Sequence, residues 1–274
     1  MLRNPMMRCT DDWGRAFRRA SRRHAPEPEG RYAAVGQLEV RDGAAVVEHI
    51  DLREAGISAL QLSRDLDVQY KTAFVLAHKL REAMGAEKAR ATVGGDVEID
   101  GAYFGGYVKP ENRKVDRKDR RLSINQSGKR RCVVVMRERA GKTLPFVFDA
   151  EADALPTIAN RVRTGSTVHA DEASCWDALH ARFAAKRINH SVAFSDDGAC
   201  TNQAESYFSR LRRAEIGTHH HISGKYLQQY ANEMAWREDH RRVPNGTLYL
   251  LVAGAALGHD VSRMWKGYWQ RWVH

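Results

Sequence analysis

The chain has 274 residues, 43% of them hydrophobic, which is enough for a folded core and excludes a wholly disordered protein. It carries 44 Lys and Arg against 34 Asp and Glu, and the formal charge of +10 predicts a polyanionic partner. Nucleic acid fits better than a membrane, because the longest apolar run, residues 248–257, is shorter than the ~20 residues of a bilayer span. The four cysteines form no C-x-x-C pair, which argues against a disulfide framework or zinc knuckle and favours a reducing cytoplasm.

The first forty residues show little hydrophobic periodicity, and we expect residues 1–40 to form a flexible basic arm. Five arginines between Arg15 and Arg23 form a cluster, which is followed by the helix-breaking stretch APEPEG at residues 25–30. The alternative is a solvated tail that has no partner.

A helical DNA-binding domain is predicted over residues 41–90. Apolar residues at helical spacing indicate three helices: the first ends near Gly56, the second is capped by Ser58, and the third runs from Gln69 to Gly85. A tight turn between the last two gives the helix-turn-helix pattern, in which the start of the second of these helices enters a major groove. The alternative is an ordinary three-helix packing unit. The predicted DNA contacts on this helix are Gln69, Tyr70, Lys71 and Lys79.

Beyond residue 90 the pattern changes to short strands, and residues 91–245 are predicted to form one α/β catalytic domain. Three apolar strands come first, and helices and strands then alternate. This is the element order of the ribonuclease H-like fold, a mixed sheet flanked by helices. The predicted elements are strands at 97–100, 132–136 and 143–148, a helix over 152–162, a strand over 166–170, a helix through Trp176 and Phe183, a strand over 187–190, and a helix from Asn202 to about Arg213.

A long basic stretch separates the first two strands. Residues 107–131 contain ten Lys and Arg, which can follow a phosphate backbone. A second basic group lies on the helix that begins at Asn202. The predicted DNA contacts of these two segments are Arg113, Lys114, Arg117, Lys118, Arg120, Arg121, Arg210, Arg212 and Arg213.

Three carboxylates are placed to meet in this fold. Asp100 lies late in the first strand, Asp171 at the carboxyl end of the fourth, and Glu205 near the start of a later helix. The first and fourth strands are neighbours at the centre of such a sheet, so the three acids converge. Hard oxygen ligands can hold two Mg²⁺ or Mn²⁺ ions, which activate a water or a 3′-hydroxyl and stabilise the leaving oxygen of a phosphodiester.

Each acid also has a local alternative. Asp100 could end its strand before a turn at Gly105, and Asp171 could cap the helix that follows it. Asn202 and Glu205 have the spacing of a capping box, with Asn as the N-cap residue.

Two histidine features accompany the carboxylates. His169 alternates onto the same strand face as Asp171, which would allow it to support that carboxylate. The run at residues 219–221 could ligate a metal, although a polar loop facing phosphates is the simpler interpretation.

Several blocks of the sequence carry a family resemblance. Residues 97–106 (VEIDGAYFGG) and 169–172 (HADE) are followed by 188–191 (INHS), 201–213 (TNQAESYFSRLRR) and 217–223 (GTHHHIS). Together they resemble the three catalytic blocks of bacterial insertion-sequence transposases of the DDE class, over roughly residues 55–242. By this resemblance the catalytic triad is Asp100, Asp171 and Glu205.

The resemblance implies a DNA transposase that cleaves insertion-sequence ends and joins the freed 3′-hydroxyls to target DNA, with two Mg²⁺ or Mn²⁺ ions held by the triad. The implied partners are double-stranded DNA, as terminal inverted repeats and target, and further copies of the chain in a homodimer or higher oligomer. The implied location is the bacterial cytoplasm, in association with the nucleoid.

The first of two departures from the family leaves alternatives open, and the second is interpreted as a subgroup difference because Asp100 is kept. Members of this branch usually begin with a four-cysteine zinc ribbon, but Cys9 stands alone here, and Gly101 follows the first Asp where many relatives have Glu. The alternatives are a degenerate DNA-binding remnant or regulator without catalysis, and a structure-selective nuclease of the same fold.

Residues 246–274 are predicted to form a C-terminal aromatic helical tail. Trp265, Tyr268, Trp269 and Trp272 recur at i, i+3, i+4 and i+7 and would form one stripe on a helix. The stripe could dock on the catalytic domain, pair two copies of the chain, or stack on exposed bases.

Overall fold

The structure is a computed structural model that describes residues 56–106, 111–119, 123–125, 128–139, 141–171, 173–188 and 200–270. The chain divides into two compact units, one of residues 87–239 and one of the residues on either side of that range. The predicted arm over residues 1–40 and the first predicted helix lie outside the described residues. No helix in the described part of the chain is long and apolar enough to cross a membrane.

The unit outside residues 87–239 is built around the helix α5 (Tyr70–Gly85), on which α4 (Ala59–Asp65) and α9 (Asn245–Gly258) pack. α4 begins as predicted, because Ser58 Oγ accepts a hydrogen bond from the Gln61 N–H at 3.1 Å. Asp67, whose φ is 50°, makes the turn between α4 and α5. Both helices of the predicted pair are therefore present.

The C-terminal aromatic residues pack on α5. Trp265 is buried, and its ring stacks on that of His78 with 4.4 Å between centroids. Trp269 Nε1 donates a hydrogen bond to the Lys71 carbonyl oxygen at 3.2 Å. The predicted helix through these residues is wrong: they form turns and the short 3₁₀ helix η7 (Tyr268–Gln270), because Gly267 has a left-handed φ of 63°. Trp272 lies outside the described residues.

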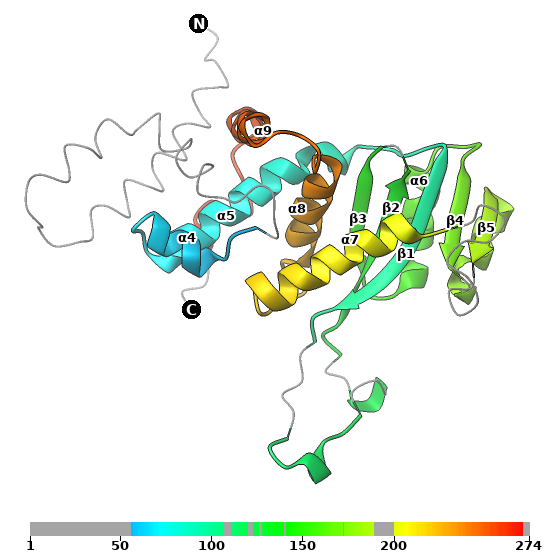
Figure 1. Cartoon of the computed structure of the whole chain (residues 1–274), viewed down its shortest axis with the longest axis horizontal. Helices are drawn as coiled ribbons and strands as arrows, with labels where there is room; N and C mark the ends of the chain where they lie inside the picture. Colours follow the sequence, from blue (N-terminus) through cyan, green and yellow to red (C-terminus); the bar gives the residue numbers. More distant parts are fainter. Residues whose placement is uncertain are drawn as a thin grey trace, which may run out of the picture. The chain divides into compact units, whose positions relative to one another are not determined.

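Residues 87–239 form a five-stranded mixed sheet flanked by helices, with the strand order β3-β2-β1-β4-β5 (Figure 1). β1 pairs with β2 in antiparallel and with β4 in parallel orientation, so the predicted ribonuclease H-like arrangement is confirmed. The fifth strand begins earlier than predicted. The strands are β1 (Asp96–Phe104), β2 (Arg131–Glu138), β3 (Thr143–Phe148), β4 (Thr167–Asp171) and β5 (Ala184–Ile188).

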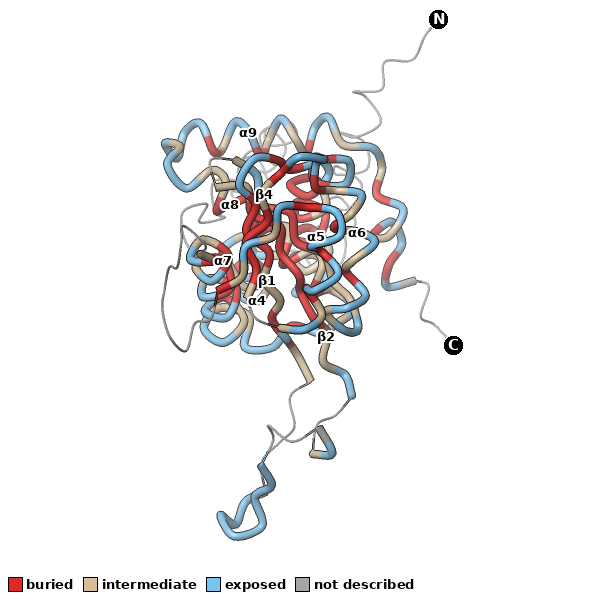
Figure 2. The backbone as a smooth tube through the Cα atoms, turned by 90° about the vertical axis from the view of Figure 1, so that its right-hand side faces the viewer, coloured by how far each residue is buried: buried red, intermediate tan, exposed pale blue. Residues whose placement is uncertain are grey.

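The two faces of the sheet pack against different elements. One face buries Val97 and Ile99 in a core with Ile158 and Trp176, and the burial is concentrated along the central strands (Figure 2). The other face carries Asp100 and is covered by α7 and α8. The helix predicted through Trp176 is a 3₁₀ helix, and the helix predicted over 152–162 begins as one. The remaining elements of this unit are η1 (Ala86–Ala89), η4 (Glu151–Ala154), α6 (Leu155–Arg161), η5 (Ser174–Ala181), α7 (Asn202–Arg213), the π-helical turn η6 (Ala214–Thr218) and α8 (Leu227–Asp239).

The basic connection between β1 and β2 begins and ends at two residues that pair with each other in the sheet. Phe104, the last residue of β1, pairs with Arg131, the first residue of β2. Every residue from 111 to 119 is exposed (Figure 2). The described part of the connection contains two single 3₁₀ turns, η2 (Lys114–Asp116) and η3 (Ser123–Asn125).

Candidate active site

Asp100 lies in the middle of β1, so both its predicted place late in the strand and the alternative that it ends the strand are wrong. Gly101 and Ala102 have little intrinsic preference for strands. Both nevertheless pair with β2, opposite Val134 and Val133, and β1 continues to Phe104. Tertiary pairing here overrides local preference.

Asp171 is the last residue of β4, as predicted, and β4 is the parallel neighbour of β1. Its Oδ1 accepts a hydrogen bond from the Ala173 N–H at 3.1 Å, so it also fixes the turn that follows the strand. The local alternative, that Asp171 caps the helix that follows it, is wrong, because Ala173 is the N-cap residue of η5 (Ser174–Ala181) and no side chain caps that helix.

Glu205 lies in the first turn of α7, which spans the predicted residues. The capping-box alternative is wrong, because Thr201 is the N-cap residue and Asn202 is already helical. The backbone N–H groups at this helix start bond instead to the carboxylate of Glu98 on β1. The side chain of Glu205 is therefore not assigned to a capping box.

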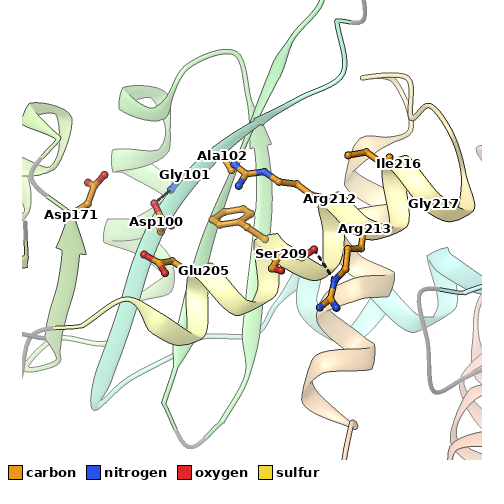
Figure 3. A pocket seen from close by; sticks show the side chains of 11 residues that line it. Asp100, Gly101, Ala102, Asp171, Glu205, Ser209, Arg212, Arg213, Ile216 and Gly217 are labelled. Atoms are coloured by element: carbon orange, nitrogen blue, oxygen red, sulfur yellow. Dashed lines mark hydrogen bonds between the residues drawn. The ribbon is translucent and has the colours of Figure 1, made fainter. Parts of the chain in front are cut away.

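The three carboxylates line one pocket of about 810 Å³. Figure 3 shows Asp100 on β1 between Asp171 on β4 and Glu205 on α7. The same pocket is lined by the basic side chains of Arg212 and Arg213, which come from the carboxyl end of α7. The pocket thus has an acidic end at the start of α7 and a basic end at the carboxyl end of the same helix.

The acidic end of the pocket disfavours charge on Asp100. Burial, together with the negative charges of Asp171, Glu205 and Glu151, raises the pKa of Asp100 from 3.8 to about 7, against the opposing effect of a hydrogen bond from the Gly101 N–H. That bond measures 2.7 Å to Asp100 Oδ1. A cation placed among these carboxylates would relieve the repulsion.

The donor set suits a hard divalent cation, since the ligands are carboxylate oxygens. Within the described residues, however, no three His, Cys, Asp or Glu side chains are already arranged to hold a metal ion, and this includes the run His219–His221. His169 is buried and its Nε2 lies 3.2 Å from Asp96 Oδ1, so its observed partner is Asp96. The three carboxylates that line the pocket therefore fit the chemistry of a divalent metal site.

Glu151 is a fourth carboxylate, for which no role was predicted. A Cβ at Gly101 would lie 2.7 Å from Glu151 Cγ, so the absent side chain leaves the room that Glu151 fills. Burial raises the pKa of Glu151, a hydrogen bond from Cys175 opposes this, and the charge of Asp171 adds to the increase. No local pattern signals this neighbour, because it lies 50 residues beyond Gly101 in the chain.

Glu98 is a second acid without a predicted role. It is fully buried on the same face of β1 as Asp100. The strand alternation places it there, and an acid on the inward face of a central strand is itself a signal, because a buried charge needs partners.

The predicted DNA contacts differ in their surroundings. Lys79 is only 8% exposed, so it is poorly placed for DNA. Arg210 forms an ion pair with the buried Glu238, with 2.9 Å between Nη1 and Oε2. Lys71 Nζ lies 5.1 Å from the centroid of the Trp269 ring. Gln69 is the N-cap residue of α5, and Tyr70 beside it is exposed. The exposed basic residues of the β1–β2 connection are Arg113, Lys114, Arg117 and Lys118. Arg120 and Arg121 lie outside the described residues.

Comparison with known protein families assigns the unit of residues 87–239 to a family. The family model of the ISXO2-like transposase domain matches residues 92–239, a range that runs from just before β1 to the end of α8 and contains all three carboxylates. No curated protein and no solved structure matches the chain.

Proposed function

Because the chain belongs to the family of ISXO2-like transposase domains, whose model covers more than half of it, we propose that it cleaves the ends of an insertion sequence and joins the freed 3′-hydroxyls to target DNA. The observation that carries the proposal is the pocket shared by Asp100, Asp171 and Glu205 within the matched range. Joining two ends calls for two active sites, so the working form is a homodimer or higher oligomer on DNA.

In this proposal Asp100, Asp171 and Glu205 hold two Mg²⁺ or Mn²⁺ ions. When bound, such ions activate a water or a 3′-hydroxyl and stabilise the leaving oxygen of the phosphodiester. Arg212 and Arg213 lie along the same pocket, where guanidinium groups can orient the phosphate that is cut.

Double-stranded DNA is held by two further segments in the proposed complex. The exposed basic residues of the β1–β2 connection contact the phosphate backbone, which gives affinity without sequence preference. The start of α5, at Gln69 to Lys71, reads the terminal repeats in a major groove. The proposed place of action is the nucleoid of a bacterial cell.

The test uses the full chain and duplex DNA that carries the sequences flanking its own gene. Incubation with Mg²⁺ or Mn²⁺ should give nicked ends and products joined to a target plasmid, and EDTA should abolish both. Glu205→Gln, which removes one carboxylate from the pocket, is the matched inactive control.

Two other outcomes correspond to the alternatives. Binding without any cleavage, under conditions where the protein is folded, indicates a DNA-binding remnant or regulator. Cleavage of branched or flapped DNA without joining indicates a structure-selective nuclease.

A further inference from the structure

The buried carboxylate of Glu98 joins the strand and the helix that carry the candidate catalytic acids. Its Oε2 accepts hydrogen bonds from the N–H groups of Gln203, at 2.8 Å, and Ala204, at 3.1 Å. These are the second and third residues of α7, and N–H groups in the first turn of a helix have no acceptor within the helix. Glu98 on β1 therefore caps α7, which packs on the same face of the sheet, and its negative charge faces the positive end of the helix dipole.

The second oxygen of Glu98 is held as well. Its Oε1 lies 3.1 Å from Nε of Arg139 in an ion pair and 3.6 Å from Sγ of Cys200. Arg139 Nη2 also donates to the Cys200 carbonyl oxygen at 3.3 Å, just before α7 begins. The buried carboxylate thus has a cation and several donors, which offset the cost of removing it from water.

The positions of these contacts couple two of the proposed metal ligands. Glu98 lies two residues before Asp100 on the same face of β1, and Ala204 directly precedes Glu205 on α7. We propose that Glu98 is a positioning residue that sets the separation of Asp100 and Glu205. The inference rests on the proposed function for its catalytic meaning, while its structural content, the fixing of the α7 start on β1, is tested separately.

A matched control exists in the same unit. Glu233 is also buried and forms an ion pair with Arg237 at 2.7 Å, but both residues lie within α8. Removal of Glu233 therefore breaks a buried ion pair without releasing α7 from β1.

The first measurement is amide hydrogen exchange of the full-length protein without metal. Glu98→Ala should speed exchange in residues 202–206 by about tenfold or more, because two N–H groups lose a charged acceptor. Glu98→Gln keeps one oxygen that can accept both bonds, but it loses the charge and turns its amide NH2 toward Arg139, so its protection should lie between those of the wild type and Glu98→Ala. Glu233→Ala should leave exchange in this segment unchanged.

The second measurement is Mn²⁺ affinity by paramagnetic resonance, together with DNA affinity and the rate of end cleavage. Glu98→Ala should weaken Mn²⁺ binding and slow cleavage by about 10- to 100-fold, as for other residues that orient metal ligands, while DNA affinity stays unchanged. Glu98→Gln should lie between the wild type and Glu98→Ala in both measurements. If Glu98→Ala does not fold, Glu98→Asp, whose shorter side chain withdraws the carboxylate from α7, takes its place with the same expectations.

The inference is overturned if a folded Glu98→Ala or Glu98→Asp protein keeps wild-type exchange at the start of α7 and wild-type Mn²⁺ affinity. It is also overturned if Glu233→Ala reproduces the effects, since they would then reflect general destabilisation. A wild-type protein that cleaves no DNA would instead contradict the proposed function, and the exchange measurement would still decide the role of Glu98.

Discussion

Burial and three neighbouring carboxylates all raise the pKa of Asp100. The folded protein therefore keeps a proton on this carboxyl group at pH values where the unfolded chain has released it. Between the ordinary pKa of 3.8 and the raised value of about 7, the folded state carries more protons. The contribution of Asp100 to the free energy of unfolding is thus present at low pH and is lost as the pH rises through 7.

This sign gives a prediction for metal-free protein in EDTA. Asp100→Asn does not titrate, so its melting temperature relative to the wild type should rise between pH 5 and pH 8, by several °C. Mg²⁺ should stabilise the wild type more at pH 8 than at pH 5 and should have little effect on the variant. Thermal melts at both pH values check this, and an equal difference at the two values would contradict it.

The three pocket carboxylates should be individually required for cleavage. Asp100→Asn, Asp171→Asn and Glu205→Gln each remove one negatively charged metal ligand, and each should lower the cleavage rate at least about 10³-fold. Affinity for duplex DNA should change little, because it comes mainly from basic groups. Single-turnover cleavage and filter binding measure the two effects.

Glu87→Gln is the control for these substitutions, because Glu87 is exposed on η1 and does not line the pocket. Full cleavage by Glu205→Gln would show that the Glu205 carboxylate takes no part in the reaction.

The β1–β2 connection should act through charge. Neutralising Arg117, Lys118, Arg120 and Arg121 together should weaken binding to any duplex, because each phosphate that a basic side chain neutralises releases counterions. The slope of log affinity against log salt concentration should fall by about one for each phosphate that is no longer neutralised, hence by up to about four. Titrations at several salt concentrations test this, and an unchanged slope would mean that the connection is a solvated loop.

Features that depend on residues close in the sequence could be predicted from it, and features that depend on contacts between distant residues could not. The Ser58 cap and the span of α7 follow from neighbouring residues, and the adjacency of β1 and β4 follows from the order of the elements. The acceptor that caps α7 could not be predicted, because Glu98 and Gln203 are 105 residues apart. Periodicity also misassigned the C-terminal aromatics, because the left-handed Gly267 interrupts their spacing.

For the whole molecule, the division into two units predicts that damage to one leaves the other folded. Deleting residues 262–274 removes Trp265 from its packing against α5 and should lower the melting temperature of that unit, since loss of a buried aromatic side chain costs about 3–5 kcal/mol. The unit of residues 87–239 should keep its melting temperature and Mn²⁺ binding. Calorimetry on the full and shortened chains separates the two transitions.

The deletion also distinguishes the other roles considered for the aromatic tail. A soluble monomer that still nicks DNA but joins it poorly would indicate an interface between copies of the chain. Unchanged stability, assembly and joining would contradict both a packing role for the tail and an interface between copies of the chain.

The pairing of Phe104 with Arg131 determines how far a change in the β1–β2 connection reaches into the sheet. The connection begins and ends at two residues that the sheet already holds together, so lengthening it costs little closure entropy and does not pull on Asp100, four residues away. Residues can therefore be inserted into or removed from this connection without changing the pairing of β1 with β2, whereas its charge is constrained by the DNA that we propose it contacts.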